Sequence, residues 1–330
     1  MPTESELTGF DPSRWRGETV NAQMRRRLGD SLRYIVDQAE GHIAIPSPEL
    51  AGFYDRLAQG PVSPLVFGAY CDLVLAIEAD DLGAAERLLR EIAAAPNVGD
   101  GPRIVDLGDP TDDSAAERYV RLVDMDPDAV VAISPPGAAS GRLRALIAEA
   151  VSLIDAGNPA LGAEIRAIVR EIVLAHGAED AKGLKFDGVS SFMLWGGVVL
   201  NVDGYSTALE LVQALAHESG HNLLFGLCVN GPLQDNDDNE RYSSPLRRDL
   251  RPMDGIVHAT YVTARMHQSI QRLLDANLLG EQQRQEAEQA NAVNARHFAS
   301  GMETVDRHAR LTALGQTVMN GARDYMRAYL

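Results

Sequence analysis

The sequence has few cysteines, few basic residues and no long hydrophobic run. Its two cysteines, Cys71 and Cys228, lie far apart among apolar residues, so we expect buried free thiols rather than a disulfide-stabilised secreted domain. No apolar stretch approaches the roughly 18 residues that a membrane span needs. The first ten residues, MPTESELTGF, lack the basic and apolar regions of a signal peptide. We therefore expect a cytoplasmic protein with no membrane partner.

Acidic residues clearly outnumber basic ones. The chain has 30 Lys and Arg against 47 Asp and Glu, for a formal net charge of −17. This balance argues against nucleic acid or an anionic membrane as the main partner, although a local basic patch could still bind a small anion. At 330 residues, 45% of them hydrophobic, the chain can bury a substantial core, so we expect a folded protein.

Hydrophobic periodicity changes along the chain. Apolar residues three and four apart predict helices over residues 14–39, 64–79 and 82–95. Short runs rich in β-branched residues, bounded by Pro, Gly and Asp, predict strands within 102–109 and 128–137. Further along, the same reasoning predicts helices over 141–156 and 159–176, strands within 184–206, a helix ending near Leu227, another from about Asp254, and a tail of one or two long helices.

These elements predict a predominantly helical α+β fold, with a small sheet beside the helix that ends near Leu227. No convincing linker or internal repeat divides the sequence. We therefore expect residues 1–330 to form a single catalytic unit, in which an N-terminal helical lobe of about residues 1–100 could be separable. The chemistry-bearing motifs fall in a core of about residues 185–280.

The most informative short motif is HESGH, which contains His217, Glu218 and His221. Thr207 and Glu210 form a capping-box pattern ahead of it, which predicts that the motif lies on a helix. Residues four apart share a helix face, so the two imidazoles can bind one metal ion. Glu218 is rotated by about 100°, away from that ion. The alternative is a helix with two hydrogen-bonded core histidines.

A metal site needs further ligands. The metzincin extension would place Gly and His three and six residues after the motif, where this chain has Leu224 and Leu227. The best third ligand is His258, near the start of the next predicted helix. Asp254, one turn earlier, and Glu240, in an acidic loop, are the reserve candidates.

Three arginines, Arg247, Arg248 and Arg251, stand between the HESGH motif and His258. One interpretation pairs them with the acidic run at 235–240. The other is a carboxylate-binding fork, because guanidinium groups grip carboxylates through two parallel hydrogen bonds. A metal next to such a fork suits an iron and 2-oxoglutarate oxygenase, whose keto acid needs a cationic anchor for its distal carboxylate. A zinc hydrolase has no such need.

HESGH together with YSSPLRRDLRPMDGIVHATY resembles the HExxH-motif peptide-modification family of ribosomal-peptide (RiPP) biosynthesis. Leu246 and Ala259 stand where that family has Trp and Gly. The resemblance covers about residues 205–265. The matching positions are Ser244, Pro245, Arg247, Asp249, Arg251, Pro252, Gly255 and His258.

The resemblance implies a dioxygenase that uses Fe(II), 2-oxoglutarate and O2 to hydroxylate a β-carbon in a precursor peptide. His217, His221 and His258 would bind the metal, Arg247 and Arg251 would bind the keto acid, and Glu218 would orient a ligand histidine or the keto acid.

Two alternatives remain open. In an HExxH zinc metallopeptidase, Glu218 would act as the general base. In a non-catalytic module, the same fold would recognise a leader peptide.

Overall fold

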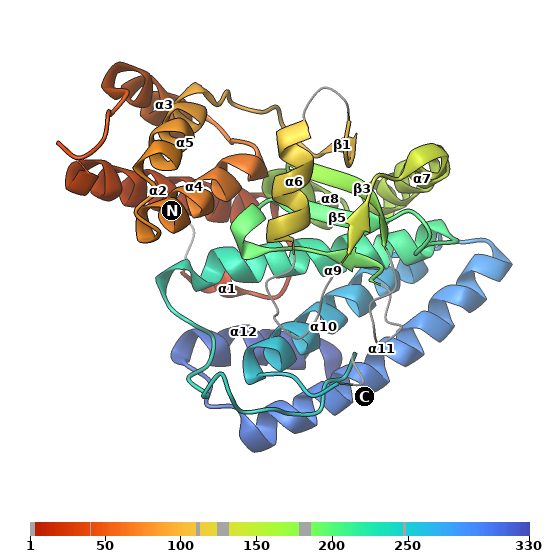
Figure 1. Ribbon diagram of the computed structural model, residues 1–330. Helices are drawn as coiled ribbons and strands as arrows, with labels where there is room; N and C mark the ends of the chain where they lie inside the picture. Colours follow the sequence, from red (N-terminus) through yellow and green to blue (C-terminus); the bar gives the residue numbers. More distant parts are fainter. Residues whose placement is uncertain (1–3, 40, 110–112, 124–131, 178–185, 247–248) are drawn as a thin grey trace. The chain divides into compact units, whose positions relative to one another are not determined.

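The computed structural model describes residues 4–39, 41–109, 113–123, 132–177, 186–246 and 249–330 (Figure 1). It is 66% helical and contains a mixed sheet of five strands, which confirms the predicted predominantly helical α+β class. No helix in these ranges is long and apolar enough to cross a membrane.

The helices are α1 Glu4–Thr8, α2 Arg14–Ala39, α3 Ser47–Gln59, α4 Pro64–Glu78, α5 Leu82–Ala94, α6 Asp113–Leu122, α7 Ser140–Gly157, α8 Pro159–Ile168, α9 Ala208–Leu227, α10 Met253–Asp275, α11 Glu281–His308 and α12 Ala313–Met326.

The chain divides into two compact units. Unit 1 comprises Met1–Gly17, Arg142–Ile165 and Tyr205–Leu330, and unit 2 comprises Glu18–Gly141 and Arg166–Gly204. Both units combine segments that are distant in sequence. The separability of an N-terminal lobe of about residues 1–100 stays a prediction.

The sheet belongs to unit 2. Its strands are β1 Arg103–Asp106, β2 Ile133–Ser134, β3 Glu171–Gly177, β4 Gly188–Val189 and β5 Gly197–Asn201. β3 pairs in parallel with β1 and β5, while β2 and β4 pair antiparallel with β3 and β5. All of β5 and the first five residues of β3 are buried, as expected for central parallel strands covered on both faces.

One predicted helix was too long. The expected helix over 159–176 ends at Ile168, and its second half forms β3. Ile172 fits the helical spacing, but it lies in a run with Val169 and Val173 that suits a buried strand equally well. Residues 171–177 form a strand rather than a helix because they pair with β1 and β5. Helices α1, α3 and α6 were not predicted.

In unit 1, α10 packs against both α9 and α11 (Figure 1). Two glycines mark these contacts. A Cβ added to Gly220 on α9 would lie 3.0 Å from Val262 Cγ1, and one added to Gly301 on α11 would collide with Thr260 Oγ1. The small residues therefore let both neighbouring helices approach α10 closely.

Candidate metal centre

The motif helix α9 forms as the sequence predicts. Thr207 is the N-cap: its hydroxyl accepts from the Glu210 backbone N–H at 3.3 Å, and the Glu210 carboxylate accepts from the Thr207 N–H at 3.1 Å. Most of α9 is buried, because apolar residues occur on nearly all its faces. His217 remains partly accessible, with 22% of its side chain exposed.

His217 and His221 turn their Nε2 atoms toward each other. The two atoms are 3.1 Å apart. Two imidazole nitrogens bound to one ion at about 2.0–2.1 Å lie roughly 2.8–3.4 Å apart for ligand angles between octahedral and tetrahedral values. The pair therefore has the spacing of two ligands on a common ion.

His258 lies in the second turn of α10 and joins the same cluster. Its Nδ1 is 3.3 Å from Nδ1 of His221, and the two rings are nearly parallel, with centroids 5.5 Å apart. Its Nε2 lies 3.8 Å from Oδ1 of Asp254, one turn earlier. The side chain of His258 is 6% exposed, whereas that of Asp254 is 54% exposed.

His221 presents opposite nitrogens to its two neighbours: Nε2 to His217 and Nδ1 to His258. One ion cannot bind both nitrogens of a single imidazole. Consistent with this, no three His, Cys, Asp or Glu side chains within the described ranges are arranged to hold one ion. The structure thus brings the three predicted histidines together as a row, with a two-ligand pair at one end.

Glu218 is buried beside this pair, with one carboxylate oxygen 3.9 Å from Nε2 of His217. Consecutive helical residues are about 100° apart, yet this carboxylate comes near the proposed ligand nitrogen of His217. The Glu218 backbone carbonyl accepts from the Asn222 side chain at 3.1 Å. The carboxylate is therefore close enough to influence a ligand histidine.

Two neighbours of the histidines were not predicted. Met266 places its sulfur 3.3 Å from Nδ1 of His217, and the Phe225 ring lies 6.2 Å from His221 and 5.4 Å from His258, between centroids. Helical spacing offers a signal for both. Phe225 is four residues after His221, and Met266 is eight residues after His258.

Of the predicted keto-acid anchors, Arg251 is described and Arg247 lies outside the described residues. Nε of Arg251 is 2.8 Å from Oδ2 of Asp249, and its side chain is 16% exposed. Its backbone forms a reciprocal pair of 2.8 Å hydrogen bonds with Tyr242, just before α10 begins. Asp249 therefore neutralises part of its charge.

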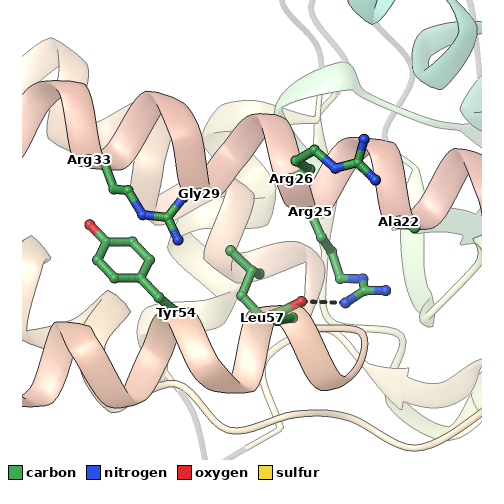
Figure 2. A pocket seen from close by; sticks show the side chains of 8 residues that line it. Ala22, Arg25, Arg26, Gly29, Arg33, Tyr54 and Leu57 are labelled. Carbon is green, nitrogen blue, oxygen red and sulfur yellow. Dashed lines mark hydrogen bonds between the residues drawn. The ribbon is translucent and has the colours of Figure 1, made fainter.

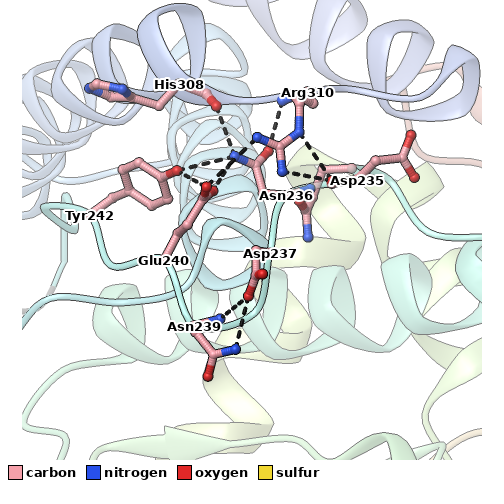
Figure 3. A network of polar contacts seen from close by, with 9 residues as sticks. Asp235, Asn236, Asp237, Asn239, Glu240, Tyr242, His308 and Arg310 are labelled. Carbon is pink, nitrogen blue, oxygen red and sulfur yellow. Dashed lines mark hydrogen bonds and ion pairs between the residues drawn. The ribbon is translucent and has the colours of Figure 1, made fainter.

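Glu240, a reserve ligand, belongs to a separate polar network (Figure 3). Its carboxylate accepts from the Tyr242 hydroxyl at 2.6 Å and from the Asn236 amide at 3.1 Å, with Arg310 3.8 Å away. The hydrogen bond from Tyr242 is the main cause of a lowered Glu240 pKa. Asn236 also donates to the His308 carbonyl at 2.9 Å. This network organises the loop after α9.

No protein-family model matches this chain, and a search of curated proteins finds no match either.

Proposed function

We propose that this protein is an Fe(II)- and 2-oxoglutarate-dependent dioxygenase that hydroxylates a β-carbon of a residue in a ribosomally synthesised precursor peptide. The observation that carries the proposal is the row of three imidazoles from α9 and α10, with a nitrogen pair at ligand spacing. Bound iron, with the keto acid and O2, supplies the oxidising power for an unactivated C–H bond.

Two of the three proposed ligands, His217 and His221, already have the spacing that a metal ion needs. His217 and His221 offer Nε2 atoms to one ion, and the partial exposure of His217 leaves it accessible from solvent. His258 faces the other nitrogen of His221, so its ring would have to reorient to bind the same ion. Three neutral histidines differ from the common set of two histidines and one carboxylate. Asp254, beside His258, is the carboxylate alternative.

Arg251 and Arg247 would hold the distal carboxylate of 2-oxoglutarate. This requirement for a cationic anchor separates an oxygenase from a hydrolase. Glu218 would orient His217 or the keto acid, since its carboxylate is buried and within 3.9 Å of the imidazole. The peptide substrate rests on the sequence resemblance over about residues 205–265.

The test is metal analysis of protein purified without oxygen, followed by an assay for conversion of 2-oxoglutarate to succinate. We expect stoichiometric iron and O2-dependent succinate formation. Both should be lost in His217→Ala, His221→Ala and His258→Ala. They should persist in His308→Ala, which removes a histidine outside the cluster. Tightly bound zinc without succinate formation would refute the proposal.

The second candidate is an HExxH zinc metallopeptidase, favoured by the closeness of Glu218 to the His217–His221 pair. There Glu218 would be the general base, and Glu218→Gln would abolish peptide hydrolysis. In the oxygenase, the same substitution should leave substantial keto-acid turnover, because no water needs activation. Retained succinate formation in Glu218→Gln would therefore exclude the peptidase.

A further inference from the structure

Unit 2 contains a groove between α2 and α3 with a volume of about 270 Å³ (Figure 2). Arg25, Arg26 and Arg33 of α2 line one side, and Tyr54, Leu57 and Ala58 of α3 line the other. Three arginine side chains thus line one groove of a chain whose net charge is −17. The volume is slightly below the usual range for drug-sized ligands, about 300–1,000 Å³.

The positive charge in the groove is only partly neutralised. Arg25 donates from Nε to Asn21 Oδ1 at 3.0 Å and from Nη1 to the Leu57 carbonyl, both uncharged acceptors. Arg26 is exposed and has no hydrogen-bond or ion-pair partner among the described residues. Arg33 has Asp30 at 3.2 Å, but both side chains are more than half exposed, so solvent weakens that pair.

The Tyr54 hydroxyl adds an unused polar group. Arg33 stacks over the Tyr54 ring at 4.3 Å from its centroid. The hydroxyl oxygen is buried, and no described residue hydrogen bonds to it. A buried hydroxyl without a partner is costly, and this one lies at the Arg33 end of the groove, away from Arg25 (Figure 2).

Arg25 also lies near another arginine of unit 2, Arg170. The pKa of Arg170 falls to about 10, mainly because the side chain is buried and partly because Arg25 repels its charge, while Asp100 opposes the decrease. Arg25 is therefore close enough to Arg170 for the two positive charges to repel each other.

Gly29 keeps the floor of the groove open. A Cβ at this position would lie 3.1 Å from Leu57 Cδ2 and 3.6 Å from Arg33 Nη1. The floor itself is apolar, formed by Leu57, Ala58 and Ala22. The groove thus combines a cationic wall with a small apolar surface.

We propose that this groove binds a small organic anion. Its carboxylate or phosphate lies against Arg25 and Arg26, and its apolar part rests on Leu57 and Ala58. Arginine forks match both kinds of anionic group, and the apolar floor selects an organic anion over an inorganic one.

The experiment is calorimetric titration of the full chain with phenyl phosphate, benzoate and inorganic phosphate at constant ionic strength. We expect saturable binding of phenyl phosphate or benzoate, and the tighter of the two identifies the anionic group. Inorganic phosphate should bind more weakly than phenyl phosphate. Equal affinities for these two would overturn the organic part of the proposal, and failure of all three to saturate would overturn the site.

Arg26→Ala is the decisive variant, because Arg26 supports no other group of the fold. It should weaken binding by about tenfold or more, the effect of a lost charge-assisted hydrogen bond. Arg27→Ala is the matched control: it removes the same charge from the next position of α2, and Arg27 does not line the groove. Gly29→Ala should also weaken binding, without any change in charge. An equal loss in Arg26→Ala and Arg27→Ala would reduce the effect to general electrostatic attraction and refute the site.

Discussion

Helix α10 contributes to two clusters of polar side chains that are built in opposite ways. In its second turn, His258 meets His221 and His217, so the cluster gathers three groups of one kind. Two turns later, Arg265 donates to Glu164 at 2.6 Å, and Arg16 donates to the other oxygen of the same carboxylate at 2.6 Å. These three charged side chains are at most 1% exposed.

The difference separates a cluster that stabilises the fold from one that we propose binds a ligand. Burial alone would raise the pKa of Glu164, but Arg16 and Arg265 lower it below its ordinary value, so the carboxylate stays ionised between opposite charges. The histidine row gathers like groups, and His217 is 22% exposed. We infer that the Glu164 cluster stabilises unit 1 and that the histidine row is reserved for a ligand.

The largest expected effect comes from breaking the Glu164 cluster. Glu164→Gln leaves two buried guanidinium groups without their counter-charge and should lower the free energy of unfolding by about 3–5 kcal/mol. Urea denaturation measures the loss. Glu303→Gln, which breaks the exposed pair with Arg307, is the control and should cost less than about 1 kcal/mol. Similar midpoints for the two variants would remove the distinction between buried and exposed pairs.

Arg251→Ala tests the keto-acid anchor beside the histidine row. Loss of a buried bidentate contact should cost about 2–5 kcal/mol, roughly 30-fold to several-thousand-fold in the half-saturating 2-oxoglutarate concentration for succinate formation. Arg251→Lys should rescue it only in part, because an ammonium group cannot form the planar fork. Arg241→Ala, an exposed arginine of the same loop, should behave like the parent protein. Unchanged half-saturation in both Arg247→Ala and Arg251→Ala would contradict the assignment.

His267 should make stability depend on pH without involving the histidine row. Burial lowers its pKa to about 4, and its Nδ1 lies 2.9 Å from the Tyr325 hydroxyl. The unfolded chain, with a His pKa near 6.5, binds more protons in the window between these values. Stability should therefore be constant above pH 6.5, fall as pH decreases toward 4, and lose up to about 3 kcal/mol.

Unfolding free energies measured across that window check the prediction. His267→Gln should flatten the slope, whatever its effect on stability at neutral pH. His176→Gln removes a more exposed histidine, which is paired with Asp203, and should leave the slope in place. An unchanged slope in His267→Gln would show that other groups cause it.

The smallest expected change in stability is that of His221→Ala in metal-free protein. The substitution removes one partly buried imidazole and leaves the nearby carboxylates of Glu218 and Asp254 in place, so we expect a change of at most about 1 kcal/mol in unfolding free energy. Iron binding should nevertheless be lost. A destabilisation as large as that of Glu164→Gln would make the histidine row a structural element instead.

The motif helix and its neighbours were predictable because their signals are local. The Thr207–Glu210 capping box and the four-residue spacing of His217 and His221 act within two turns. The Glu164 cluster was not predictable, since Arg16 and Arg265 lie 148 and 101 residues from Glu164 and look like solvated helix charges in sequence. The paired nitrogens of His221 depend on side-chain torsions that no sequence pattern specifies.

The close approach of α9 and α11 to α10 has a mechanical consequence. Val262 fills the space opposite Gly220, and Thr260 fills the space opposite Gly301, so α10 has no room to slide toward either neighbour. The position of α10, which carries His258, is therefore fixed by its packing against α9 and α11. The histidine row can adjust mainly through the torsions of its own side chains. If it binds a metal as we propose, ions of different radius would be accommodated by ring rotation rather than by helix displacement.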